Sequence, residues 1–215
     1  DVSYKKDNVA MNLTSDISDI LPDDEITPEE LSTQEYVFDR SELAVAMQEN
    51  LDMLAGVALP DTCELLFPPT YHIMWEYIKE KLAKQRGFAR VYLGIPRGFC
   101  KTTFLRLLSL YIVLYTERNF TCIFNRTGEL AENSLASVQG MLDEPNIVTT
   151  FGNWRNNLTR DTLGVKQFAF RGRNNILAAL GINGSIRGLN IRDRRPDVMI
   201  YDDIQDWDNA ESVVL

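Results

Sequence analysis

The sequence predicts an α/β domain in which a largely parallel sheet is flanked by helices. From residue 89 onward, short apolar segments alternate with longer helical patterns, which is typical of parallel strands joined by helices. Of the 215 residues, 45% are hydrophobic and 25% are charged, the composition of an ordinary globular chain. No apolar run approaches the roughly 18 residues that a membrane span needs, so we expect no membrane contact.

The expected elements begin with two helices, one over residues 41–55 and one from Pro68-Pro69 to about Lys84. An apolar segment at 89–95 predicts a strand that ends in a Pro-Arg-Gly turn. The remaining expectations are a buried helix at 102–115, a strand at 120–124, an amphipathic helix at 129–142, a hairpin of 165–170 with 175–180, and a strand at 198–201.

The charge is unevenly distributed along the chain. The net charge is −9, which taken alone argues against a nucleic-acid partner. However, residues 1–66 hold 16 acidic and 3 basic residues, whereas residues 67–195 hold 9 acidic and 19 basic. We therefore expect an acidic, partly flexible arm at 1–40, a helical segment at 41–85 that packs on the core, and a core at 86–215.

Three cysteines lie far apart, with no C-x-x-C pair among them. This spacing argues against a disulfide scaffold or a zinc site and fits a reducing compartment.

The segment Gly94–Thr103 has the position of a phosphate-binding loop, after an apolar strand and before a helix. The backbone amides of such a loop and the helix N-terminus bind phosphate groups. Lys101 would reach the β- and γ-phosphates of ATP, and Thr102 would bind Mg²⁺. The residues expected to contact the nucleotide are Pro96, Arg97, Gly98, Phe99, Cys100, Lys101, Thr102 and Thr103.

The match to the usual loop pattern is imperfect, because Ile95 and Cys100 occupy positions where glycine is expected. A side chain at residue 100 would crowd the loop backbone and lower nucleotide affinity. The alternative is an ordinary strand–turn–helix with a chance Lys-Thr pair.

The expected strand at 198–201 is followed by two carboxylates, Asp202 and Asp203. In a P-loop ATPase this strand lies beside the strand of the phosphate loop. Asp202 would bind Mg²⁺ through water, and Asp203 would orient the attacking water or accept its proton. The alternative is ordinary turn chemistry at a strand end.

Together, the loop and the acidic strand resemble the ATPase domain of the large terminase subunit of tailed bacteriophages, the DNA-packaging motor. The resemblance extends from about Leu66 to Asp208, and three stretches support it: 96–102, 184–189 and 195–203. It implies a P-loop NTPase of the RecA-like (ASCE) kind. It also implies that Arg97 contacts the γ-phosphate and that Arg187 reaches the nucleotide of a neighbouring subunit.

The resemblance further implies partners: double-stranded DNA, other copies of the chain in a ring on the procapsid portal, the portal protein and the small terminase subunit. The location would be the cytoplasm of the infected bacterial host. Tyr71-His72 stand where these ATPases often place a glutamine that contacts adenine. We expect no nuclease activity, because the nuclease domain of these proteins is absent from this sequence. Candidates for gripping the DNA backbone are Arg155, Arg160, Arg171 and Arg173.

Two other functions remain open at this point. The same loop and acidic pair would serve a P-loop helicase or another nucleic-acid translocase. Alternatively, the residues that replace the loop glycines would mark a docking module with a degraded nucleotide site.

Overall fold

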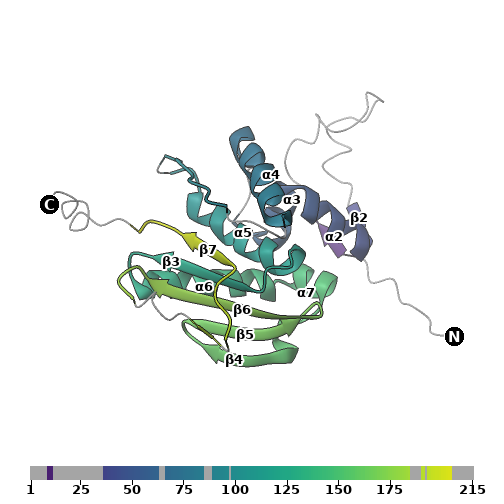
Figure 1. The fold of residues 1–215 in the computed structure, drawn as a ribbon. Helices are drawn as coiled ribbons and strands as arrows, with labels where there is room; N and C mark the ends of the chain where they lie inside the picture. Colours follow the sequence, from purple (N-terminus) through teal and green to yellow (C-terminus); the bar gives the residue numbers. More distant parts are fainter. Residues whose placement is uncertain are drawn as a thin grey trace. The chain divides into compact units, whose positions relative to one another are not determined.

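The computed structural model describes residues 9–11, 36–62, 66–84, 89–96, 98–184, 190–191 and 193–204 (Figure 1). The chain divides into two compact units. The first comprises Asp1–Tyr77 and Glu144–Gly152, and the second comprises Ile78–Asp143 and Asn153–Leu215. Most of the expected acidic arm lies outside the described residues.

The first unit contains a two-stranded antiparallel ribbon of β1 (Val9–Met11) and β2 (Tyr36–Phe38). Its helices are α2 (Arg40–Glu49), α3 (Leu51–Ala58) and α7 (Pro145–Phe151). The prediction of a single helix at 41–55 is wrong, because the helix is interrupted at Asn50. Asn50 has extended backbone angles, and its side chain accepts hydrogen bonds from the amides of Asp52 and Met53. Asn50 thus caps α3 instead of continuing α2.

The expected second helix is confirmed as α4 (Pro69–Ala83), which begins directly after Pro68. Tyr71, Trp75 and Ile78 form its buried side. Among the described residues, we find no helix whose length and hydrophobicity would let it traverse a bilayer.

The second unit is an α/β fold around a five-stranded sheet of order β4-β5-β6-β3-β7 (Figure 1). The strands are β3 (Phe120–Asn125), β4 (Leu158–Thr162), β5 (Val165–Phe170), β6 (Arg173–Gly181) and β7 (Val198–Tyr201). Strand β3 pairs in parallel with β6 and β7, whereas β4–β5 and β5–β6 are antiparallel. The sheet is therefore mixed, and the expected parallel arrangement holds for its β6-β3-β7 part.

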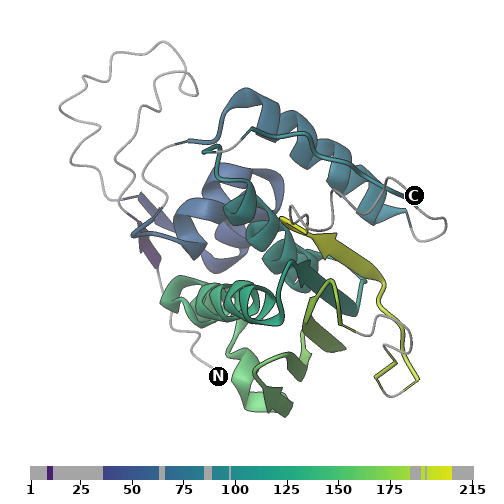
Figure 2. The ribbon, with the colours of Figure 1, turned by 90° about the vertical axis from the view of Figure 1, so that its left-hand side faces the viewer.

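Two helices of this unit pack on the sheet, α5 (Lys101–Tyr115) and α6 (Gly128–Asp143) (Figure 2). A 3-10 turn, η1 (Trp154–Asn157), leads into β4. Most of α5 is buried, as its apolar sequence predicts, with Phe104, Leu107 and Leu110 fully inaccessible. The other face of the sheet carries a cluster of Phe120, Cys122, Phe124, Ile176 and Ala178, against which Ile191 and Ile204 pack.

The strand expected at 89–95 does not form. Residues 89–96 carry no β-structure, and Val91 and Tyr92 are exposed by 38% and 86%. Within the described part of the chain, β7 pairs with β3 and its other edge has no strand beside it. The expected placement of the acidic strand beside a loop strand is therefore wrong for the described residues. A strand needs a neighbouring strand that supplies backbone hydrogen bonds. The apolar character of residues 89–95 favours a strand but does not supply that neighbour.

Candidate functional site

The candidate site lies where β3 and β7 end, beside the N-terminus of α5. Parallel strands bring their carboxyl ends to one edge of the sheet, and Asp202 follows β7 at that edge. The Asp202 amide donates to Phe124 O at 2.9 Å, and the Asn125 side-chain amide donates to Asp202 O at 3.0 Å. These two bonds fix the backbone of Asp202, which is only 4% exposed.

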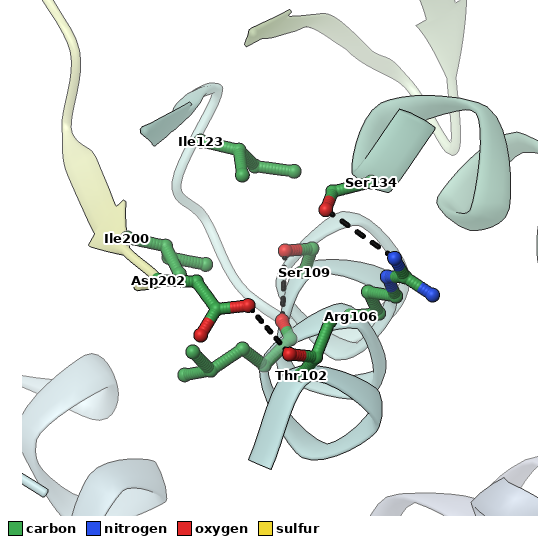
Figure 3. A pocket seen from close by; sticks show the side chains of 8 residues that line it. Thr102, Arg106, Ser109, Ile123, Ser134, Ile200 and Asp202 are labelled. Atoms are coloured by element: carbon green, nitrogen blue, oxygen red, sulfur yellow. Dashed lines mark hydrogen bonds between the residues drawn. The ribbon is translucent and has the colours of Figure 1, made fainter. Parts of the chain in front are cut away.

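Asp202 meets the two residues that begin α5. Thr102 Oγ1 donates to Asp202 Oδ2 at 2.7 Å, across a separation of 100 residues in sequence. Lys101 Nζ lies 3.8 Å from Asp202 Oδ1. The structure thus brings together Lys101, Thr102 and Asp202, three of the residues singled out from the sequence (Figure 3 shows the Thr102–Asp202 bond).

The loop before α5 adopts a backbone that favours glycine at two positions. Gly98 has φ 83° and Cys100 has φ 53°, which is the left-handed region. Cys100 precedes the first residue of α5, and its side chain makes no capping bond. The helix therefore begins with amides that no side chain of residue 100 satisfies, which is the arrangement that binds anions. Pro96, Gly98, Phe99 and Cys100 are all exposed, so the loop is open to solvent.

Replacing Cys100 with glycine is expected to raise the free energy of unfolding by about 0.5–1 kcal/mol, because the left-handed conformation costs energy for a residue with a Cβ. Urea denaturation measures this change. Cys100→Ala, which keeps the Cβ, is the matched control and should leave the free energy of unfolding near that of the unmodified chain. If Ala stabilises as much as Gly, the left-handed backbone is not the source of the strain.

Asp203 is exposed and also left-handed, with φ 47°. Its carboxylate forms no hydrogen bond or ion pair with the described residues, so it faces solvent directly beside the fixed Asp202. Non-glycine residues held in this region of backbone space tend to occur at functional sites.

A cavity of about 10 Å³ lies behind Asp202, between α5, α6, β3 and β7 (Figure 3). It is lined by Thr102, Leu105, Arg106, Ser109, Ile123, Ser134, Ile200 and Asp202. Arg106 and Asn125 were not predicted from the sequence to belong to this site. Arg106 is a charged residue within the otherwise apolar body of α5, and it follows Thr102 by one helical turn. This spacing was the available signal.

The Arg106 guanidinium is partly buried in this cavity. Burial lowers the pKa of Arg106, and attraction to the carboxylate of Asp202 acts in the opposite direction. Its Nη2 donates to Ser134 Oγ at 3.5 Å, the outer limit of a hydrogen bond. Its Nε is buried and has no hydrogen-bond partner within the described segments.

The residues present fit a magnesium ion bound together with phosphates. The described segments contain no group of three or more His, Cys, Asp or Glu side chains that could hold a metal unaided. Mg²⁺, however, is usually held by one or two protein oxygens, with water and substrate phosphates completing the shell. Thr102 and Asp202 supply such oxygens, and Asp202 Oδ1 is buried without a hydrogen-bond partner among the described residues.

Arg97, Arg187, Tyr71 and His72 were also singled out from the sequence. Arg97, Arg187 and most of the 184–189 segment fall outside the described residues. Tyr71 is 2% exposed against the ring of Phe67, and His72 Nε2 lies 3.0 Å from Asp52 Oδ2. Tyr71 and His72 therefore have structural roles in the first unit.

Arg155 and Arg173, which are expected to grip DNA, bind other groups of the protein. Arg155 forms an ion pair with Asp143 and stacks over the ring of Trp154 at 4.7 Å. Arg173 donates to Val113 O at 2.8 Å near the C-terminal end of α5, and burial lowers its pKa. Arg160 and Arg171 are exposed to solvent, and Arg171 also interacts electrostatically with Tyr115.

Comparison with models of known protein families, with curated proteins and with solved structures found no match to this chain.

Proposed function

We propose that this chain is a magnesium-dependent ATPase of the terminase large-subunit kind, which powers the movement of double-stranded DNA into a procapsid. The observation that supports this most is the 2.7 Å bond between Thr102 at the start of α5 and Asp202 at the end of β7. A P-loop ATPase needs this pairing of a loop hydroxyl with a carboxylate at a strand end, because the two share one metal ion. The proposal includes a RecA-like P-loop fold.

The proposed roles follow from the positions of the residues. Lys101 and the free amides at the start of α5 bind the β- and γ-phosphates of ATP. Thr102 and, through water, Asp202 hold Mg²⁺, which when bound neutralises the charge on the phosphates. Asp203, exposed beside this pair, orients the attacking water and accepts its proton. The resemblance to terminases assigns Arg97 to the γ-phosphate and Arg187 to the nucleotide of a neighbouring subunit.

The proposed partners are those of a packaging motor: double-stranded DNA, further copies in a ring on the portal, the portal protein and the small terminase subunit. The proposed location is the cytoplasm of the infected bacterial host. Such a motor must accept any DNA sequence, so its contacts go to backbone phosphates. Arg160 and Arg171 are the exposed candidates for those contacts.

Linear double-stranded DNA is expected to stimulate ATP hydrolysis more than single-stranded DNA of equal length. Arg160→Ala and Arg171→Ala should each lower the slope of log affinity against log salt by about 1, because each removes one phosphate contact. Arg155→Ala is the control, since Arg155 is already paired with Asp143. Stimulation of ATP hydrolysis by single-stranded DNA alone would favour a helicase. A hydrolysis rate that neither kind of DNA changes would contradict the packaging role.

A second candidate is a docking module with a degraded nucleotide site. The absence of a strand at 89–96 and the side chain at Cys100 favour it. This candidate predicts no ATP binding, which separates it from the ATPase in a single titration.

A further inference from the structure

Arg106 places a permanent positive charge inside the second unit. It follows Thr102 by one turn on α5, between the buried residues Phe104 and Leu107. An arginine side chain keeps its proton at any ordinary pH, so its charge cannot be removed by burial. A cation taken out of water is costly unless an opposite charge compensates it.

Hydrogen bonds do not account for the position of Arg106. Its one bond, to Ser134 Oγ, is at the 3.5 Å limit, and its buried Nε has no partner in the described part of the chain. Figure 3 shows its side chain on the opposite side of the cavity from Asp202, with the Thr102–Asp202 bond below. The carboxylate of Asp202 is the charged group identified as attracting it.

Asp202 is a carboxylate with only 4% exposure, so its negative charge also needs an opposite charge nearby. Its ion pair within 4 Å is with Lys101, whose side chain is 34% exposed. The phosphates of a nucleotide would compete for Lys101, which has a flexible stem. Arg106 is anchored within α5 and lines the same cavity as Asp202, from the opposite side.

We propose that Arg106 is a positioning residue that supplies the internal counter-charge of Asp202, and that it opposes the binding of a divalent cation to the same carboxylate. The shared cavity supports the pairing, since Thr102, Arg106 and Asp202 all line it. The opposition follows from Coulomb repulsion between two cations close to one carboxylate. The pairing of Arg106 with Asp202 stands on its own, whereas its effect on metal binding rests on the proposed ATPase function.

A double-mutant cycle tests the pairing without metal or nucleotide. Arg106→Met, Asp202→Asn and the double variant are unfolded with urea in EDTA. Because each single variant already loses the pair, the double variant should be more stable than additivity predicts: its unfolding equilibrium constant should lie at least tenfold below the additive value, about 1.4 kcal/mol. Additive effects would overturn the pairing. If Arg106→Met alone does not fold, Asp202→Asn must restore folding in the double variant, and a double variant that stays unfolded contradicts the proposal.

Two control variants make the cycle specific. Arg173→Met also removes a partly buried arginine from this unit, but one that binds Val113 O and is attracted to Glu117 rather than to Asp202. Its effect should be additive with that of Asp202→Asn. Arg106→Lys keeps the charge and should retain most of the coupling. Coupling of equal size for Arg173→Met would show a general loss of stability rather than a charge pair.

Metal affinity tests the second half of the proposal. Mg²⁺ is titrated calorimetrically into protein saturated with ADP. Arg106→Met should bind Mg²⁺ about tenfold more tightly than the unmodified chain, whereas Arg106→Lys and Arg173→Met should match it. A merely structural role for Arg106 predicts weaker binding instead, and equal or weaker binding would overturn the opposition. Failure of the unmodified chain to bind ADP would refute the ATPase proposal. The urea cycle would still test the pairing, because it uses neither metal nor nucleotide.

Discussion

Replacing Asp203 with asparagine should lower the rate of ATP hydrolysis by about 10²–10⁴-fold while ATP affinity stays within about twofold, because the change removes a proton acceptor and nothing else. Asp203 is exposed, and its carboxylate forms no hydrogen bond or ion pair with the described residues, so the substitution breaks no such bond there. Asparagine also tolerates the left-handed backbone at φ 47°. A loss of hydrolysis would therefore report chemistry rather than folding.

Steady-state hydrolysis and calorimetric ATP binding together measure this effect. Asp193→Asn is the matched control, since Asp193 is another exposed aspartate with a left-handed backbone, at φ 59°. It should leave both quantities unchanged. Hydrolysis by Asp203→Asn at the unmodified rate would mean that Asp203 does not act on the water.

Replacing Asp202 with asparagine is expected to lower turnover by about 10²–10³-fold and to remove the increase in ATP affinity that Mg²⁺ produces. The amide oxygen can still accept the hydrogen bond from Thr102, so the loop-to-strand contact survives. What is lost is the negative charge that would hold the cation. ATP affinity in EDTA should stay close to that of the unmodified chain.

Asp197 offers a control at the opposite end of β7 from Asp202. It lies before the amino end of β7, and its Oδ2 accepts hydrogen bonds from the amides of Asn119 and Phe120 at 2.9 and 3.0 Å. Asp197→Asn should reduce the free energy of unfolding by about 1 kcal/mol without changing ATP binding in either buffer. If both variants lost Mg²⁺-dependent binding equally, the effect would come from damage to β7 and not from the carboxylate of Asp202.

The sequence predicted most of the second unit correctly because its pattern is local. The buried helix α5, strand β3, the β5–β6 hairpin and strand β7 all follow from runs of apolar residues bounded by turn signals. The sequence also predicted that Thr102 and Asp202 bind the same Mg²⁺, and the structure brings these two residues together. Strand β4 was missed because its residues are mostly polar and exposed, as an edge strand allows.

The remaining errors involve information that a single segment does not contain. The pattern across residues 41–55 is continuous, yet the capping bonds of Asn50 end one helix and begin another. Residues 89–95 form the short apolar segment of a typical buried strand, but among the described residues they have no strand with which to pair. The fold places Asn125 beside Asp202 and Arg106 across the cavity from it, although they are 77 and 96 residues away in sequence.

The most direct test of the central claim is calorimetric titration of ATP into the unmodified chain, with Mg²⁺ and again with EDTA. The claim is that Lys101, Thr102 and Asp202 form one nucleotide and metal site. It predicts saturable binding with one ATP per chain and an affinity that Mg²⁺ increases. No binding under either condition would contradict the claim and favour the docking module, and binding indifferent to Mg²⁺ would contradict the role given to Thr102 and Asp202.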